Sequence, residues 1–166
     1  MKETRIWIVA DRQYRGYERL RVKIMKISEL LQRIDYMVLQ GNLSDEVTGI
    51  CHDNRMIQEG DAFICISGVR FDTHTMAKEL AKKAALLVVE KPVELEDGCK
   101  TAVVQVASTR DIVAALAAAF YGYPSEKVVC IGITGSKGKT TCTHMMADIL
   151  RAAGYLTGTI GTNGAI

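Results

Sequence analysis

The stretch GITGSKGKTT, residues 132–141, decides how the second half of this chain folds. It follows the apolar run 128–131, which predicts a buried strand. It precedes a segment in which apolar residues recur at helical spacing, namely Met145, Met146, Ile149 and Leu150. A strand, a glycine-rich turn ending in Gly-Lys-Thr and a helix are together typical of a phosphate-binding loop. Main-chain N–H groups and the positive end of the helix then hold the phosphates.

Two side chains of this loop carry the expected chemistry. Lys139 is expected to reach the β- and γ-phosphates as a point charge, and the Thr140 hydroxyl to bind Mg²⁺, which makes them the candidate catalytic residues. The strict motif has a glycine at the position of Ile133, whereas here the glycine lies one place earlier, at Gly132. The alternative interpretation is a glycine-rich turn that caps a helix and leaves Lys139 solvated.

Composition limits the class of protein. A chain of 166 residues suggests one or two domains, and its net charge of +2 gives no strong case for nucleic acid or an anionic membrane as a partner. A basic, tyrosine-containing stretch at 12–21 leaves a nucleic-acid patch as a weaker alternative. No apolar run is long enough to span a bilayer. The five cysteines are scattered without metal-ligand spacing, so free, mostly buried thiols in a reducing compartment are expected.

The pattern along the chain predicts three segments. Residues 1–24 are interpreted as an upstream extension, poorly ordered apart from a short strand at 6–9, with Met25 as the natural start. Residues 25–123 form the first domain and 124–166 the beginning of a second, separated at Tyr123-Pro124-Ser125. In the first domain we expect helices at 27–34 (Ser28 as its cap), 75–83 and 109–121 (Ser108 as its cap), and strands at 47–51, 62–66, 85–89 and 102–106. A further strand is expected at 156–160.

This alternation predicts an α/β fold. The last forty or so residues supply only one βαβ unit, whereas a nucleotide-binding α/β domain typically has on the order of 100 to 150 residues. The length therefore suggests that the sequence stops inside its second domain.

Two long runs carry a family resemblance. The run GITGSKGKTTCTHMMADILRAAGYLTGTIGT, residues 132–162, resembles the ATP-binding loop and first helix of the Mur ligases, which tolerate the shifted glycine. The run CHDNRMIQEGDAFICISGVRFDTHTMAKELAKKAALLVVEK, residues 51–91, resembles their amino-terminal domain through its D-x-R, G-D-x-F and D-x-H elements. The order of these elements, followed by FYGYPS at 120–125, most resembles the MurE branch, and the resemblance spans roughly residues 26–164.

The resemblance implies a small amino-terminal α/β domain that binds the UDP moiety, followed by the first βαβ part of a P-loop ATPase domain. It implies an ATP- and Mg²⁺-dependent ligase of peptidoglycan synthesis in the bacterial cytoplasm. Such an enzyme adds a diamino acid, meso-diaminopimelate or L-lysine, to UDP-MurNAc-L-Ala-D-Glu through an acyl phosphate. A monomer with neither nucleic acid nor membrane insertion is expected.

Site residues follow from matching positions in the resemblance. The ATP loop is carried over to Gly135, Ser136, Lys137, Gly138, Lys139, Thr140 and Thr141. Asn54 stands where the family usually has the serine of an Asp-Ser-Arg triplet that contacts the UDP-sugar, and Asp53 and Arg55 flank it, with a local turn closed by an ion pair as the alternative. Gly68 and His74 bound the loop that matches the segment along the UDP moiety, and a structural role for His74 is favoured over a catalytic one. Thr162 is placed near the peptide.

Several family features would lie beyond Ile166, namely the carbamylated lysine, further Mg²⁺ ligands and the carboxy-terminal domain. We therefore expect this chain alone to lack ligase activity. Other interpretations are a MurF-like ligase, a non-enzymatic module that binds UDP-sugar or nucleotide, and an unrelated P-loop GTPase or kinase.

Overall fold

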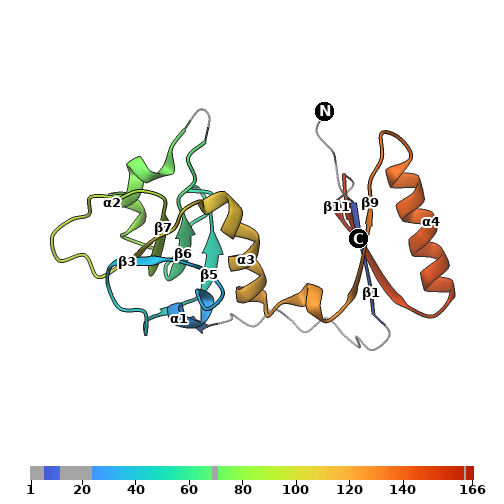
Figure 1. Cartoon of the computed structure of the whole chain (residues 1–166), viewed down its shortest axis with the longest axis horizontal. Coiled ribbons are helices and arrows are strands. Elements are labelled where there is room, and N and C mark those ends of the chain that lie inside the picture. The colour runs from blue at the N-terminus through green and yellow to red at the C-terminus, as the bar shows by residue number, and fades with distance from the viewer. Residues whose placement is uncertain (1–5, 12–23, 69–70, 163) are drawn as a thin grey trace. The chain divides into compact units, whose positions relative to one another are not determined.

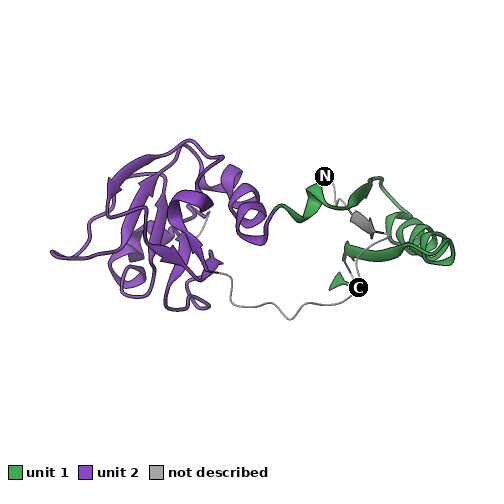
Figure 2. Cartoon of the chain, turned by 90° about the horizontal axis from the view of Figure 1, so that it is seen from below, with its two compact units in different colours: residues 1–18, 123–166 green, residues 19–122 purple. Residues whose placement is uncertain are grey.

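The computed structural model describes residues 6–11, 24–68, 71–162 and 164–166 (Figure 1). The chain divides into two compact units, each with its own sheet. Unit 1 comprises Met1–Glu18 and Tyr123–Ile166, and unit 2 comprises Arg19–Gly122 (Figure 2). The α/β class expected from the sequence is confirmed, because each unit combines a sheet with helices.

Unit 2 contains a five-stranded sheet in the order β3-β8-β7-β6-β5. Its strands are β3 (Met37–Gln40), β5 (Gly49–Cys51), β6 (Asp61–Ile64), β7 (Leu86–Val89) and β8 (Ala102–Gln105). Strands β5, β6, β7 and β8 run parallel to one another, and β3 pairs with β8 antiparallel. Every residue of β6 and β7 is buried, as expected for parallel strands with both faces covered.

Short helical segments and one long helix accompany this sheet: α1 (Ile27–Leu30), the 3-10 turn η1 (Thr73–Met76), α2 (Ala77–Leu80) and α3 (Thr109–Tyr121). The Ser108 side chain accepts a hydrogen bond from the Asp111 N–H, so the predicted cap of α3 is confirmed. The helix ends at Gly122, whose left-handed φ of 75° suits glycine. Strands β2 (Met25–Lys26) and β4 (Glu46–Val47) form a separate small pair.

The core of unit 2 lies between the sheet and α2. Phe63, Leu87 and Val103 from three adjacent strands pack with Leu80 and other buried residues of one apolar cluster. Thr101 is buried next to this cluster and donates its hydroxyl toward the carbonyls of Ala81 (2.7 Å) and Ala84 (3.0 Å). It thereby ties the segment after α2 to the start of β8.

Replacing Thr101 with valine is expected to destabilise unit 2 by about 1 to 2 kcal/mol, because the shape is kept while buried carbonyls lose their donor. Urea unfolding measures the change. Thr48→Val is the matched control, because the Thr48 hydroxyl bonds the Glu59 carbonyl at an exposed position. Equal destabilisation by the two variants would show that burial of the Thr101 hydrogen bonds does not matter.

Unit 1 is built on a four-stranded sheet in the order β11-β10-β1-β9. Its elements are β1 (Ile6–Asp11), η2 (Pro124–Glu126), β9 (Val129–Ile133), α4 (Lys139–Ala152), β10 (Leu156–Gly161) and β11 (Gly164–Ala165). Strand β1 pairs antiparallel with both β9 and β10, so those two strands run parallel to each other with one strand between them. The β9-α4-β10 crossover therefore passes over β1.

Apolar side chains of unit 1 are exposed to an unusual extent for a sheet and its crossover helix. Val129 on β9 is 65% exposed, Ile149 on α4 63% and Leu156 on β10 54%. The strand and helix predicted around the glycine-rich loop are thus confirmed, but the burial predicted for the strand at 128–131 is wrong for Val129.

Several local predictions need correction. The helix expected at 27–34 is limited to α1, and Ser28 lies inside it rather than capping it, because Lys26 is the N-cap residue. The strand expected at 47–51 is divided into β4 and β5, and the helix expected at 75–83 into η1 and α2. Strand β3 was not predicted. All five cysteines are free, but only Cys51 and Cys65 are buried.

The segment interpreted as an upstream extension contributes β1, and the strand expected at 6–9 is confirmed as its first four residues. Residues 1–5 and 12–23 of that segment lie outside the described residues.

Candidate nucleotide and substrate sites

The glycine-rich loop lies between β9 and α4 of unit 1, as the sequence predicted. Gly138 is the residue before the helix and has a φ of 78°, a left-handed conformation that L side chains rarely adopt. Among the described residues no side chain caps the start of α4. The N–H groups of its first turn therefore face outward at the positive end of a fourteen-residue helix, which is the arrangement that binds anions.

Lys139 begins this helix and its side chain folds back over the loop. Its Nζ donates to the carbonyl of Gly135 at 2.5 Å, so the ammonium lies against the loop rather than away from it. Thr140 follows on the first turn and is half-buried. Ser136, Lys137 and Thr141 are exposed around the same turn. The structure thus brings all seven residues of the predicted ATP loop together between β9 and the first turn of α4.

A small pocket adjoins this loop within unit 1. It is lined by residues of α4, of β10 and β11, and of the positions next to those strands: Thr140, Thr143, His144, Thr159, Gly161, Thr162, Gly164 and Ile166. Thr143 is buried and donates its hydroxyl to the Lys139 carbonyl at 2.8 Å, which anchors the first turn of α4. The structure thus places Thr162, the predicted peptide-side residue, in the same pocket as Thr140.

In unit 2 the predicted substrate residues follow the carboxyl ends of the parallel strands, where α/β sheets commonly bind ligands. After β5, Asp53 accepts from the Arg55 side chain at 2.9 Å (Oδ1 to Nε) and 2.6 Å (Oδ2 to Nη2). These bonds hold the pKa of the Asp53 carboxyl far below its usual value. The local turn closed by an Asp53–Arg55 ion pair, which the sequence left as an alternative, is therefore present in the structure. Asn54 points toward Met76, with Nδ2 3.6 Å from its Sδ.

After β6, Ser67 and Gly68 open a loop that returns through Phe71 and Asp72 to η1. The Gly68 N–H donates to the Phe71 carbonyl at 2.9 Å, and a Cβ at Gly68 would lie 2.7 Å from that same oxygen. Only glycine fits at this position, because any side chain would collide with the Phe71 carbonyl oxygen. Arg110, at the start of α3, donates to the Ser67 carbonyl at 2.9 Å and so holds the other end of the turn.

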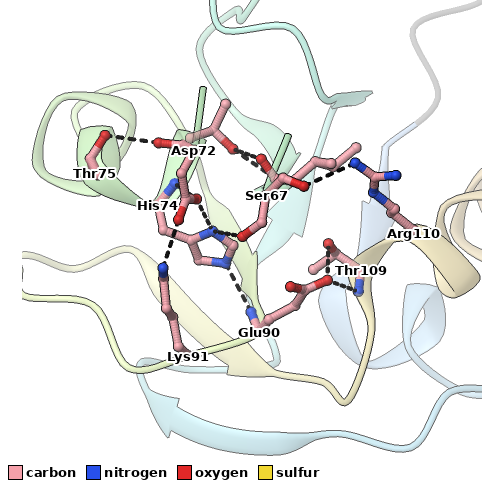
Figure 3. A network of polar contacts seen from close by, with 10 residues as sticks. Ser67, Asp72, His74, Thr75, Glu90, Lys91, Thr109 and Arg110 are labelled. Atoms are coloured by element: carbon pink, nitrogen blue, oxygen red, sulfur yellow. Dashed lines mark hydrogen bonds and ion pairs between the residues drawn. The ribbon is translucent and has the colours of Figure 1, made fainter. Parts of the chain in front are cut away.

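His74 is buried, whereas a side chain that contacts a substrate has to be accessible. Its Nδ1 lies 2.6 Å from Asp72 Oδ1, and its Nε2 lies 3.0 Å from the main-chain nitrogen of Glu90 (Figure 3). Lys91 Nζ lies 2.6 Å from the other Asp72 oxygen, and this ion pair is the main cause of the lowered pKa of Asp72. The geometry favours the structural alternative for His74.

Sequence reasoning missed Glu90, Lys91, Thr109 and Arg110 as parts of this edge. Glu90 and Lys91 come directly after β7, and Thr109 and Arg110 open α3 after β8. Polar residues at the ends of apolar strands were the available signal, since these strands share one sheet edge.

The described residues were also compared with the requirements of a metal site and of a membrane-spanning helix. No cluster of three or more His, Cys, Asp or Glu side chains suited to a metal ion occurs there. None of the helices described has the length and apolar character needed to cross a membrane.

Family comparisons match both units. A model described as the catalytic domain of the Mur ligase family matches residues 46–121, within unit 2, and the Mur ligase middle domain matches residues 133–165, within unit 1. The chain belongs to the Mur ligase family, and the resemblance drawn from its sequence is confirmed.

Curated relatives with similar sequences indicate which branch of the Mur ligase family this chain resembles. A ligase of Clostridium perfringens named UDP-N-acetylmuramoyl-L-alanyl-D-glutamate–2,6-diaminopimelate ligase is 38% identical over 139 residues, which cover 83% of this chain and 28% of that protein. The ligase of the same name from Bacillus cereus is 40% identical over the same shares. The chain thus spans less than a third of the length of these curated relatives. A MurF crystal structure from Acinetobacter baumannii matches 59% of this chain and 21% of its own, with 26% identity and a TM-score of 0.49.

Proposed function

We propose that this chain is the amino-terminal part of an ATP-dependent ligase that joins diaminopimelate to UDP-MurNAc-L-Ala-D-Glu. The observation that carries the proposal is its identity, 36–40% in four clostridial and bacillar examples, to proteins named for that reaction. The naming of these relatives favours diaminopimelate over L-lysine. We expect the ligase to act in the bacterial cytoplasm as a monomer.

The loop of unit 1 fits the phosphates of ATP on its own chemistry. It combines a glycine in a left-handed conformation, an uncapped helix start among the described residues, and an ammonium already directed at the loop. Lys139 and the main-chain N–H groups of the loop would neutralise charge on the transferred phosphoryl group. Thr140 would hold Mg²⁺, which supplies further charge neutralisation when bound.

The reaction assigned to the complete ligase begins with transfer of the γ-phosphoryl group to the side-chain carboxylate of D-Glu. The amine of the diamino acid then attacks the acyl phosphate, and phosphate leaves as the amide forms. Lys139 acts by orienting the phosphates and offsetting their charge, since phosphoryl transfer depends mainly on positioning and electrostatics. The edge of unit 2 that holds Asn54 and Gly68 would bind the UDP moiety.

Calorimetric titration of this chain with Mg·ATP, and separately with UDP-MurNAc-L-Ala-D-Glu, tests the proposal. Saturable binding of the UDP-linked dipeptide, with weaker binding of a MurF-type UDP-linked tripeptide, is the expected result. Binding of neither ligand would overturn the proposal. Binding of both UDP compounds with equal affinity would favour a general UDP-sugar module over this ligase.

We predict that this chain alone releases no phosphate from ATP in the presence of UDP-MurNAc-L-Ala-D-Glu and diaminopimelate. The reason is that it spans only 28% of the Clostridium perfringens ligase it matches. A phosphate-release assay measures the outcome, with the complete relative as the positive control. Substrate-dependent turnover by the isolated chain would contradict the prediction.

A further inference from the structure

Strand β1 of unit 1 comes from a part of the chain that the two family models leave unmatched. Its residues, Ile6–Asp11, lie before both matched ranges, 46–121 and 133–165. It nevertheless lies inside the sheet of unit 1, between β9 and β10. The sheet that carries the glycine-rich loop is therefore completed by a segment that neither family match covers.

Strand β1 sets the separation of β9 and β10. These two strands run parallel and each pairs with β1, so they lie two strand spacings apart, about 10 Å. Because β9 is at the edge of the sheet, β1 is its only neighbouring strand in the described part of the chain. The α4 helix contacts β1 as well as β10. Release of β1 would therefore leave β9 without a strand partner and α4 with only part of its support.

The pairing of β1 reaches the ends of β9 and β10 that lead into the candidate nucleotide site. Trp7 pairs with Gly132, near the end of β9 where the glycine-rich loop begins. Ile8 pairs with Thr159, which is buried and lines the small pocket beside Thr140. Strand β1 thus joins the strand that enters the loop to the strand that lines this pocket.

The loop between β9 and α4 has little packing of its own. A Cβ at Gly138 would lie within 4 Å of no atom beyond its chain neighbours, and one at Gly135 would meet only the Lys137 carbonyl, at 3.7 Å. The first turn of α4 includes the bond from the Cys142 N–H to the Gly138 carbonyl at 2.9 Å. The position of the loop is therefore set by β9 and α4 at its two ends, and both of them contact β1.

We propose that β1 is a positioning strand for the nucleotide site. It holds the glycine-rich loop at a fixed separation from the end of β10 at 159–161, so that nucleotide binding and the pairing of β1 stabilise each other. The reason is linkage, because a ligand that binds only while β1 is paired disfavours its release by the same factor. The identity of the ligand, Mg·ATP, rests on the proposed function, whereas the pairing of β1 stands on the geometry of unit 1.

Amide hydrogen exchange of the unaltered chain, with and without Mg·ATP, tests this coupling without any substitution. With Mg·ATP at about a hundred times its dissociation constant, the protected N–H groups of β1, β9 and β10 should exchange about a hundredfold more slowly. Exchange in β6 and β7 of unit 2 should not change and is the internal control. Slowing confined to the loop and α4, with β1 unchanged, would overturn the proposal.

A reversible disulfide fixes the pairing of β1 without any ligand. Val9 lies directly opposite Cys130, an exposed free thiol, and Cα atoms of such antiparallel pairs are about 4.5 to 5.5 Å apart, which a disulfide spans. Val9→Cys treated with oxidised glutathione should therefore link β1 to β9. Ala10→Cys is the matched control, because Ala10 lies opposite Val129. Without ligand, exchange of the Cys142 N–H should be at least about tenfold slower in oxidised than in reduced Val9→Cys, and unchanged in the control.

The oxidised Val9→Cys chain should also bind Mg·ATP at least as tightly as its reduced form, since the disulfide fixes the paired state. Loss of ATP binding on oxidation, with recovery on reduction, would contradict the proposal, because β1 would then have to leave its place for the nucleotide. An unchanged Cys142 exchange rate in the oxidised chain would contradict it as well. If the unaltered chain binds no ATP, the nucleotide part of the proposed function fails, while the Cys142 exchange rate still decides whether β1 holds the loop.

Discussion

Replacing Lys139 with alanine is expected to lower the affinity of the chain for Mg·ATP by about one to two orders of magnitude. A charge-assisted hydrogen bond to phosphate contributes about 1.5 to 3 kcal/mol, and the variant loses it without altering the backbone of the loop. The structure supports this assignment because the Lys139 ammonium already lies against the loop, at the carbonyl of Gly135. Calorimetry or a fluorescent ATP analogue measures the change.

Lys127→Ala is the matched control, since Lys127 is an exposed lysine at the end of η2 in the same unit. It removes the same charge from unit 1 and is expected to change ATP affinity by less than about twofold, as a screened surface charge should. Equal losses in the two variants would mean that only net charge matters, and the phosphate-loop assignment would then be wrong. Circular dichroism of each variant verifies that α4 is retained.

A chain that begins at Met25 is expected to lose the fold of unit 1 while unit 2 remains folded. Strand β1 supplies the hydrogen-bond partners of both β9 and β10, through five residue pairs on each side. Without it β9 has no partner strand and β10 keeps only β11, and a two-stranded hairpin alone is marginally stable in water. Limited proteolysis should cut rapidly within 123–166 in the shortened chain and slowly in the complete one, with hydrogen exchange in β6 and β7 unchanged.

A point substitution tests the same strand without shortening the chain. Ile8→Pro removes an N–H from the middle of β1 and should reproduce the protease sensitivity, whereas Ile8→Val should not. Full protection of 123–166 in the chain starting at Met25 would show that β1 is dispensable. Intact-mass measurement of the natively expressed protein addresses the separate hypothesis that Met25 is the natural start.

Short-range patterns predicted most of the elements but few of their partners. The strand, glycine-rich turn and helix at 128–152 were predicted because apolar spacing and loop chemistry are local properties, and β9 and α4 confirm them. The cap at Ser108 and the ending at Gly122 were predicted for the same reason. By contrast, β1 lies more than a hundred residues from β9 in sequence, so its pairing cannot be inferred from local pattern.

The candidate sites show the same division. Lys139 and Thr140 were predicted from a motif within ten residues, and the structure brings them together with the rest of the loop. The polar contacts at the carboxyl ends of β6, β7 and β8 join residues up to 43 positions apart, from Ser67 to Arg110, so only the tertiary structure reveals them. The D-x-H pattern left a structural role for His74 open, but the burial of this side chain and its two partners, Asp72 and the main chain of Glu90, are visible only in the tertiary structure.

The exposed apolar surface of unit 1 has a consequence for the lifetime of this chain in a cell. Val129, Ile149 and Leu156 present to water the kind of surface that chaperones and quality-control proteases recognise. The chain expressed on its own should therefore be degraded rapidly, which lowers its steady-state abundance at a given rate of synthesis. A pulse-chase comparison in cells with and without an active quality-control protease would make that turnover visible.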